Sequence, residues 1–173
     1  MAYDNERVAS AIKAYLVTNL PAKLAAVQVS WAATDPVTLP AVVTWFLGYK
    51  PTLLEMDASA FPFLSVMAPA REAREDKAQW GYQGNLVHAF VDFAVPAADE
   101  ATANKIAHRY AEAIIQALQA QASFEEYYQV NYEPPVSMIS FTRHHKELAN
   151  SDAFNSDDEY FLSVNSIAVD LVG

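Results

Sequence analysis

The sequence predicts an α+β domain in which two helices cover one face of a mainly antiparallel sheet. Three observations predict this class. The chain has 173 residues, of which 53% are hydrophobic and 18% charged, a composition that can bury the core of one domain. Two segments, about 5–20 and 99–121, place apolar residues at helical spacing. The strand-like segments come in neighbouring pairs instead of alternating with helices, which favours antiparallel pairing.

The first helix is expected over residues 5–20. Asp4 or Asn5 can cap its N-terminus. Apolar residues then recur every three or four positions, which is the spacing of one buried helix face. Pro21 is expected to end this helix, because a proline inside a helix removes a hydrogen bond and clashes with the preceding turn. Residues 22–27 could form one further turn.

Residues 28–60 show no single clear pattern. Asp-Pro and Leu-Pro pairs mark loops. The β-branched and aromatic residues of 42–49 favour a strand, and 53–56 could form another. The sequence therefore leaves open whether this stretch is strand or loop.

Two strands with strong apolar character flank a charged segment. Residues 61–67 predict a strand with a proline near its start. Residues 86–95 alternate regularly, as a half-buried strand does, and Pro96 is expected to stop that strand. The segment between them, about 68–85, is polar and charged without an apolar period. It is expected to be a long charged loop or the tip of a hairpin.

The second half of the chain supplies the second helix and two more strands. Asp99 and Glu100 open the helix of 99–121, where acidic residues suit the helix dipole. Strands are expected over 136–143 and 160–172, joined by a polar, acidic connection.

The sheet face turned away from the helices is expected to be too polar for a core. Its residues would be His88, Phe90 and Asp92, with either Ser163 and Asn165 or Ser166 and Asp170 from the last strand. A face of this kind, which keeps a few large apolar groups, often meets another subunit. It could instead serve a small ligand-binding or regulatory domain that uses the His88/Asp92 face.

Charge and composition argue against several function classes. The chain carries 11 Lys and Arg against 21 Asp and Glu, for a net charge of -10, whereas a nucleic-acid binder usually presents a basic surface. It contains no cysteine, which excludes disulfides and thiolate metal sites. Its four scattered glycines cannot form a clustered phosphate-binding loop. Neither a signal peptide nor a membrane span is expected, because no basic and apolar leader opens the chain and its apolar runs are short.

Three short clusters could carry chemistry, but each has a plainer interpretation. His144 and His145 are neighbours, so on a strand they point to opposite faces and cannot chelate one ion together. The acidic run 152–159 lacks the glycine and the bidentate glutamate of an EF-hand loop. Glu125 and Glu126 could work as an acid–base pair, but adjacent acids are usually surface charge. We therefore expect no enzyme activity and no catalytic, metal or cofactor-binding residue.

The segment 70–83 is the strongest candidate for a protein-interaction site. Its basic and aromatic residues are Arg71, Arg74, Lys77, Trp80 and Tyr82. Arg, Trp and Tyr are the residue types that dominate binding hot spots. Interleaved acids leave the segment near neutral, unlike a phosphate clamp. Two interpretations stay open, a docking arm for another protein and a solvated hairpin.

Several elements in a fixed order span most of the chain. A helix over 6–20 is followed by the proline-containing strand 61–67, a charged loop, the strand 86–95, the helix that Asp99 and Glu100 open, and two closing strands. This order resembles that of the tail-terminator and tail-completion, or head–tail joining, proteins of long-tailed bacteriophages. Against that pattern, residues 28–60 are long and are interpreted as a possible insertion into a single domain of residues 1–173.

The resemblance implies a structural virion protein. Such a protein forms a homo-oligomeric ring, expected to be a hexamer, that caps the tail tube and joins the tail to the head. Its partners would be further copies of itself, the tail tube protein and a head connector or neck protein, with assembly in the host cytoplasm. DNA would pass through the ring without specific binding. The resemblance brings no catalytic residue, no cofactor and no contact with a membrane.

Overall fold

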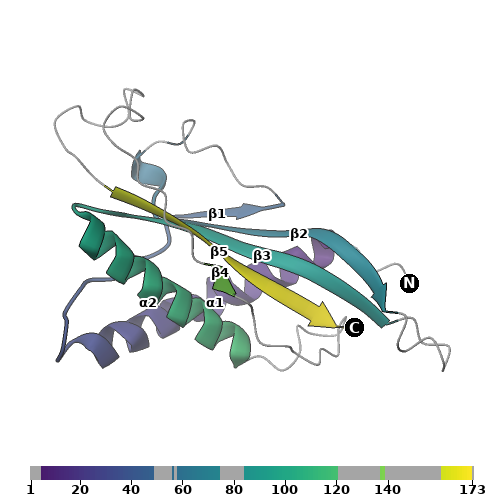
Figure 1. Cartoon of the computed structure of the whole chain (residues 1–173), viewed down its shortest axis with the longest axis horizontal. Coiled ribbons are helices and arrows are strands. Elements are labelled where there is room, and N and C mark those ends of the chain that lie inside the picture. The colour runs from purple at the N-terminus through teal and green to yellow at the C-terminus, as the bar shows by residue number, and fades with distance from the viewer. Residues whose placement is uncertain are drawn as a thin grey trace.

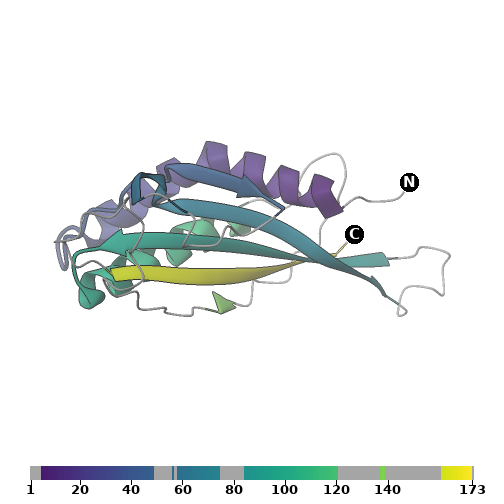
Figure 2. The ribbon, with the colours of Figure 1, turned by 90° about the horizontal axis from the view of Figure 1, so that it is seen from above.

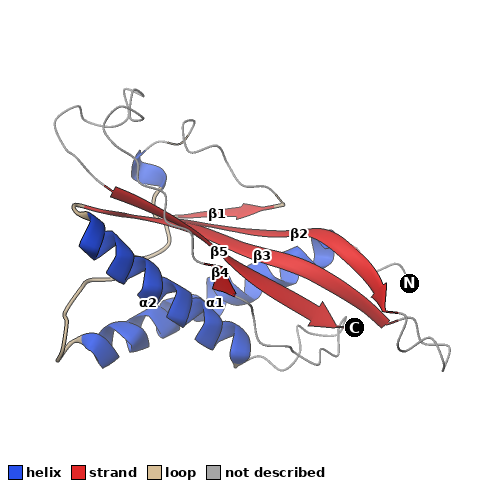
Figure 3. Cartoon of the chain, in the orientation of Figure 1, coloured by secondary structure: helices blue, strands red, loops and turns tan. Residues whose placement is uncertain are grey.

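The computed structural model describes residues 5–48, 56, 58–74, 84–120, 137–138 and 161–172. Two long helices and a five-stranded sheet account for most of this part of the chain (Figures 1 and 3). In chain order the elements are α1 (Asn5–Trp31), β1 (Thr44–Leu47), η2 (Ala58–Ala60), β2 (Phe63–Arg74), β3 (Gly84–Ala97), α2 (Glu100–Gln119), β4 (Ser137–Met138) and β5 (Phe161–Val172). The predicted α+β class is confirmed.

The sheet is mixed but mainly antiparallel. Its strand order is β1-β2-β3-β5-β4. β1 runs parallel to β2, and the other three neighbouring pairs are antiparallel. β2 and β3 form a long hairpin, and β5 pairs with β3 over the whole length of β5.

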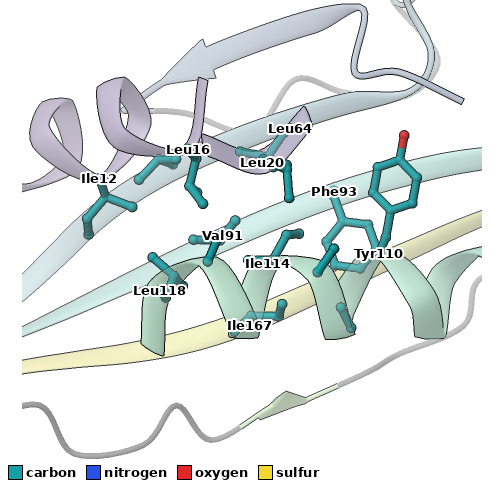
Figure 4. Packing of buried hydrophobic residues seen from close by; sticks show 14 of the residues in the cluster. Ile12, Leu16, Leu20, Leu64, Val91, Phe93, Tyr110, Ile114, Leu118 and Ile167 are labelled. Atoms are coloured by element: carbon teal, nitrogen blue, oxygen red, sulfur yellow. The ribbon is translucent and has the colours of Figure 1, made fainter. Parts of the chain in front are cut away.

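The two helices pack on the same face of the sheet, as predicted. The buried core lies between them and β2, β3 and β5 (Figure 4). Its largest fully buried side chains include Ile12, Leu16, Leu20, Leu64, Phe93, Tyr110, Ile114, Leu118 and Ile167. The rings of Phe93 and Tyr110 stack with centroids 5.9 Å apart, which joins β3 to α2.

The prediction that α1 ends before Pro21 is wrong. The helix runs on to Trp31 with Pro21 in its interior. Leu24 and Val27 are buried and continue the apolar face of the first half. Pro21 has no N–H to donate to the carbonyl of Val17, but both residues are exposed, so water can satisfy that carbonyl. The packing of the second half therefore outweighs the local cost of the proline.

The second helix agrees with its predicted range to within about two residues. Asp99 is its N-cap and accepts a hydrogen bond from the Thr102 backbone N–H at 2.9 Å. The Thr102 hydroxyl donates to the same carboxylate at 2.6 Å. These hydrogen bonds from Thr102, the side-chain one first, hold the pKa of Asp99 below its ordinary value.

The opposite face of the sheet contains a second, smaller core, which the sequence analysis did not expect. It consists of Met56, Phe61, Phe63, Ala94, Leu162 and Val164, with Phe46 and Ala60 packed against it. The register also decides between the two options for β5. Ser166 lies opposite Asp92 on this face, whereas Asn165 lies opposite Phe93 and faces the helices.

The hairpin of β2 and β3 is longer than predicted. Residues 68–74 and 84–85 belong to strands and not to the expected loop, and residues 75–83 lie outside the described part. The register shifts between Met67 and Ala70, around the exposed Pro69. Figure 2 shows the paired strand ends lying beyond the first turn of α1. A strand beyond the end of the helices has no core to cover. Its sequence therefore does not need to alternate apolar and polar residues, and no strand pattern is visible in it.

The prediction that Pro96 stops its strand is also wrong. β3 continues to Ala97, and Pro96 pairs with Leu162 of β5. The pairing with β2 ends at Ala94. One edge of β3 is therefore without β2 at Pro96, which is the setting in which a sheet tolerates proline.

The remaining predictions fall partly outside the described residues. β1 lies within the strand expected at 42–49, and β5 matches the strand expected at 160–172. Of 136–143 only the two residues of β4 are described, and of 53–56 only Met56, which is not in a strand. The candidate clusters at Glu125, Glu126, His144, His145 and 152–159 all lie outside the described part.

Candidate functional site

An apolar groove runs between the second half of α1 and the extended segment that leads into β1. Its volume is about 260 Å³. It is lined by Val17, Leu20, Pro21, Leu24, Ala25, Gln28, Leu39, Ala41, Val42 and Trp45. Gln28 is the one lining residue with an amide side chain, so the groove suits an apolar or aromatic group. We call it the α1–β1 groove.

Hydrogen bonds from both helices hold the wall of the groove opposite α1. The Leu39 backbone N–H donates to Gln28 Oε1 of α1 at 2.8 Å. The Tyr110 hydroxyl of α2 donates to the carbonyl of Pro40. Burial raises the pKa of Tyr110 above its ordinary value, so the hydroxyl keeps its proton and remains a donor. An extended segment without strand partners depends on side-chain contacts of this kind.

Large apolar side chains at the rim of the groove are open to solvent. Val17 on α1 is 44% exposed, and Val43, next to the lining residue Val42, is 58% exposed. Trp45 is half-buried. Single exposed apolar residues are ordinary, but several around one apolar groove form a patch, and such patches mark interaction sites.

The groove borders the β1 edge of the sheet, beyond which no further strand is described. β1 is the first strand in the sheet order and pairs on one side, with β2. The N–H groups of Thr44 and Gly48 donate toward β2, to Pro62 and Val66. Along a strand, the N–H and C=O groups of successive residues point to opposite sides, so the backbone groups of Trp45 point away from β2. The Trp45 carbonyl accepts a hydrogen bond from Lys13 Nζ of α1 at 3.3 Å.

A polar cluster fixes the turn that follows α1 and so sets where the groove wall begins. Asp35 forms salt bridges with Arg109 at 2.9 Å and with Lys105 at 3.0 Å. The Arg109 guanidinium also lies over the ring of Trp31, 4.9 Å from its centroid. Trp31 in turn donates to Glu112 at 3.3 Å. The cluster joins residues about 70 positions apart, so no sequence spacing indicated it.

Of the residues predicted as an interaction site, the structure describes only Arg71 and Arg74, and neither lines the α1–β1 groove. Arg71 and Arg74 belong to the backbone of β2, opposite Val87 and Gly84 of β3. Lys77, Trp80 and Tyr82 lie outside the described part of the chain. The described residues thus place the start of the predicted arm at the end of the hairpin. The sequence analysis missed the groove, because its two walls come from separate segments.

His88 and Asp92 lie on the sheet face away from the helices, as predicted. Asp92 is 3% exposed, and His88 is half-buried. Asp92 stands in a row with Ser65 of β2 and Ser166 of β5 as its cross-strand neighbours. Neither His88 nor Asp92 lines the α1–β1 groove.

Metal ligands and membrane spans were sought in the same described ranges. Within them no three His, Asp or Glu side chains come together in a way that could hold a metal ion. No described helix has both the length and the apolar character needed to cross a membrane.

Comparison of the sequence with protein-family models finds no match, and comparison with curated proteins finds none either.

Proposed function

We propose that this chain is a structural virion protein of a long-tailed bacteriophage. In this proposal it forms a homo-oligomeric ring that caps the tail tube and joins the tail to the head. The observation that carries the proposal is the order and arrangement of the elements. α1, the β2–β3 hairpin, α2 and β5 occur in the order on which the resemblance to tail-terminator proteins rests, with both helices on one sheet face.

The surface of the molecule supports self-association. The α1–β1 groove and the exposed side chains of Val17 and Val43 leave apolar area on the described part of the chain. Burying such a patch against a neighbouring subunit is the usual source of interface stability.

The charge of the chain suits a ring that DNA passes through. A net charge of -10 disfavours tight binding to phosphate, because binding DNA requires basic groups that displace counterions. The further partners in this proposal are the tail tube protein and a head connector or neck protein. Its place is the neck of the virion, after assembly in the host cytoplasm.

A ligand-binding role for the His88/Asp92 face has weaker support. Asp92 is almost fully buried, and the smaller core occupies part of the same face. A ligand site needs an open concave surface with accessible polar groups. The one groove described above lies elsewhere.

Negative-stain electron microscopy of the purified protein, with the mass of the same sample from light scattering, tests the proposal. We expect rings of about six copies with a central hole. A monomer or dimer at the highest soluble concentration would contradict a ring-forming function. A genetic test is independent of purification: phage particles made without this chain should fail to join heads to tails of normal length.

A further inference from the structure

A ring places a specific demand on the surface of its subunit. In a cyclic assembly of more than two copies each contact is heterologous, so one surface of a subunit meets a different surface of the next. The subunit must therefore carry a donor surface and a separate acceptor surface. The described chain presents one feature of each kind. The β2–β3 hairpin projects past the start of α1 (Figure 2), and the α1–β1 groove is an apolar hollow elsewhere on the surface.

The hairpin cannot reach the groove of its own chain. Its strands pair as far as Arg74 and Gly84, beyond the first turn of α1 (Figure 2). The middle of the intervening segment 75–83 extends at most about 16 Å from there, at roughly 3.3 Å per residue. Leu24, in the middle of the groove, lies roughly 28 Å along α1 from Asn5 at about 1.5 Å per residue. An arm that enters this groove must come from another copy.

The chemistry of the two surfaces is complementary. The segment 75–83 contains Trp80 and Tyr82, and the groove is lined almost entirely by apolar side chains. Its volume of about 260 Å³ is just below the roughly 300–1,000 Å³ of usual small-molecule sites, which suits aromatic anchors better than a cofactor.

Charge and backbone groups favour the same pairing. Residues 5–48 carry three basic and two acidic side chains, whereas the whole chain has a net charge of -10. Lys13 lies at the β1 edge, and the segment 75–83 has a small negative charge, since Glu75 and Asp76 outnumber Lys77. The backbone of Trp45 faces away from β2, on the side where an added extended chain could pair with β1.

From these observations we infer that the α1–β1 groove is the acceptor surface for a second copy of this chain. The occupant is the segment 75–83 of that copy, anchored by Trp80 and Tyr82. The inference rests on the proposed ring and names its subunit contact. The donor surface lies at the end of the β2–β3 hairpin, and the acceptor surface lies along the second half of α1. Each subunit would therefore contact the next one head to tail around the ring.

A pair of complementary variants tests the inference. Ala25→Glu places a charge in the groove, and Trp80→Ala with Tyr82→Ala removes the anchors. Each variant alone should lose the ring and give the mass of a single chain in light scattering. An equimolar mixture should give a dimer and no ring, because one intact groove then meets one intact arm.

Matched controls separate assembly from folding. Ala26 is exposed beside Ala25 on α1 but does not line the groove, so Ala26→Glu should form rings like the unmodified protein. Ala41→Glu approaches the groove from the opposite wall and replaces Ala25→Glu if that variant fails to fold. Circular dichroism should show the same melting temperature for all folded variants.

The outcomes distinguish this inference from the ring proposal. If Ala25→Glu and Ala41→Glu form rings like the unmodified protein, the groove is not the acceptor, and the ring proposal stands. If the variants lose the ring but their mixture stays monomeric, another segment or partner fills the groove, and the arm is not its occupant. If the unmodified protein forms no ring, the proposed function fails, and the inferred contact fails with it.

Discussion

The two helices share one core but differ on their outer surfaces. α2 buries its apolar stripe completely, and its exposed residues are polar, charged or small. α1 also buries an apolar stripe, from Val8 to Val27, but it leaves Val17, Val29 and Trp31 exposed. Among the described residues, α1 therefore carries more apolar side chains than its contacts bury. A helix with this excess, beside a groove and the β1 edge of the sheet, indicates contact with another molecule.

The inner faces of the two helices should respond alike to a buried charge. Ile114→Asp in α2 and Leu16→Asp in α1 each place a carboxylate where the side chain is fully buried. We expect each to lower the free energy of unfolding by more than about 4 kcal/mol, enough to unfold the domain. Circular dichroism measures the loss of structure. Ala101→Asp, on the exposed side of α2, is the control and should fold. A folded Leu16→Asp variant would mean that only α2 contributes to the core.

Within α1 the buried and exposed apolar residues should differ in what they stabilise. Leu20→Ala opens a cavity in the core, and we expect a loss of about 2–5 kcal/mol in denaturant unfolding. Val17→Ala should change that free energy by less than about 0.5 kcal/mol, because Val17 is largely solvent-accessible. Val17→Ala should instead weaken ring formation. Equal losses of stability for the two variants would remove the distinction between the faces of α1.

The salt bridges of Asp35 connect the turn after α1 to α2. Substitutions at these residues measure how much the two bridges contribute to stability. Asp35→Ala leaves the guanidinium of Arg109, which is 5% exposed, without its partner carboxylate. We expect a loss of about 1–3 kcal/mol of stability. Lys105→Gln removes only the more exposed ion pair and should cost less than about 1 kcal/mol. Similar effects of both changes would show that burial of Arg109 is unimportant.

The smallest effect concerns the N-terminus of α2 and depends on pH. The hydrogen bonds from Thr102 hold the pKa of Asp99 in the folded chain below its ordinary value. Its contribution to stability is therefore present above that value and is lost as the pH falls through the folded pKa. Asp99→Asn keeps a capping acceptor but cannot titrate. The variant should lose part of the acid dependence of the melting temperature, and an unchanged profile would contradict the role of this cap.

Much of the fold could be predicted from local patterns. The second helix, the alternation along 86–95 and the apolar face of 5–20 depend on spacings of two or about 3.6 residues, which a short window reveals. The two errors at prolines occur where a distant contact outweighs a local rule. α1 passes through Pro21 because Leu24 and Val27 find partners in the core. β3 passes through Pro96 because β2 has already ended there.

Less of the candidate site could be predicted. Composition predicts an interaction segment within 70–83, where Arg, Trp and Tyr cluster, and that prediction stays untested. The groove had no such signal, because its lining comes from 17–28 and 39–45, and the sequence does not show that these segments lie together. The salt bridge between Asp35 and Arg109 likewise joins side chains from distant segments.

The sequence by itself determined the α+β class, the apolar faces of the two helices and the negative net charge of the chain. These follow from the period of apolar residues and from the counts of charged ones, and neither depends on the rest of the fold. Only the tertiary structure decided where α1 ends, which strand lies at the sheet edge and which apolar residues stay exposed. Those outcomes depend on which distant segments pack together, because burial and hydrogen bonding between them outweigh local preferences.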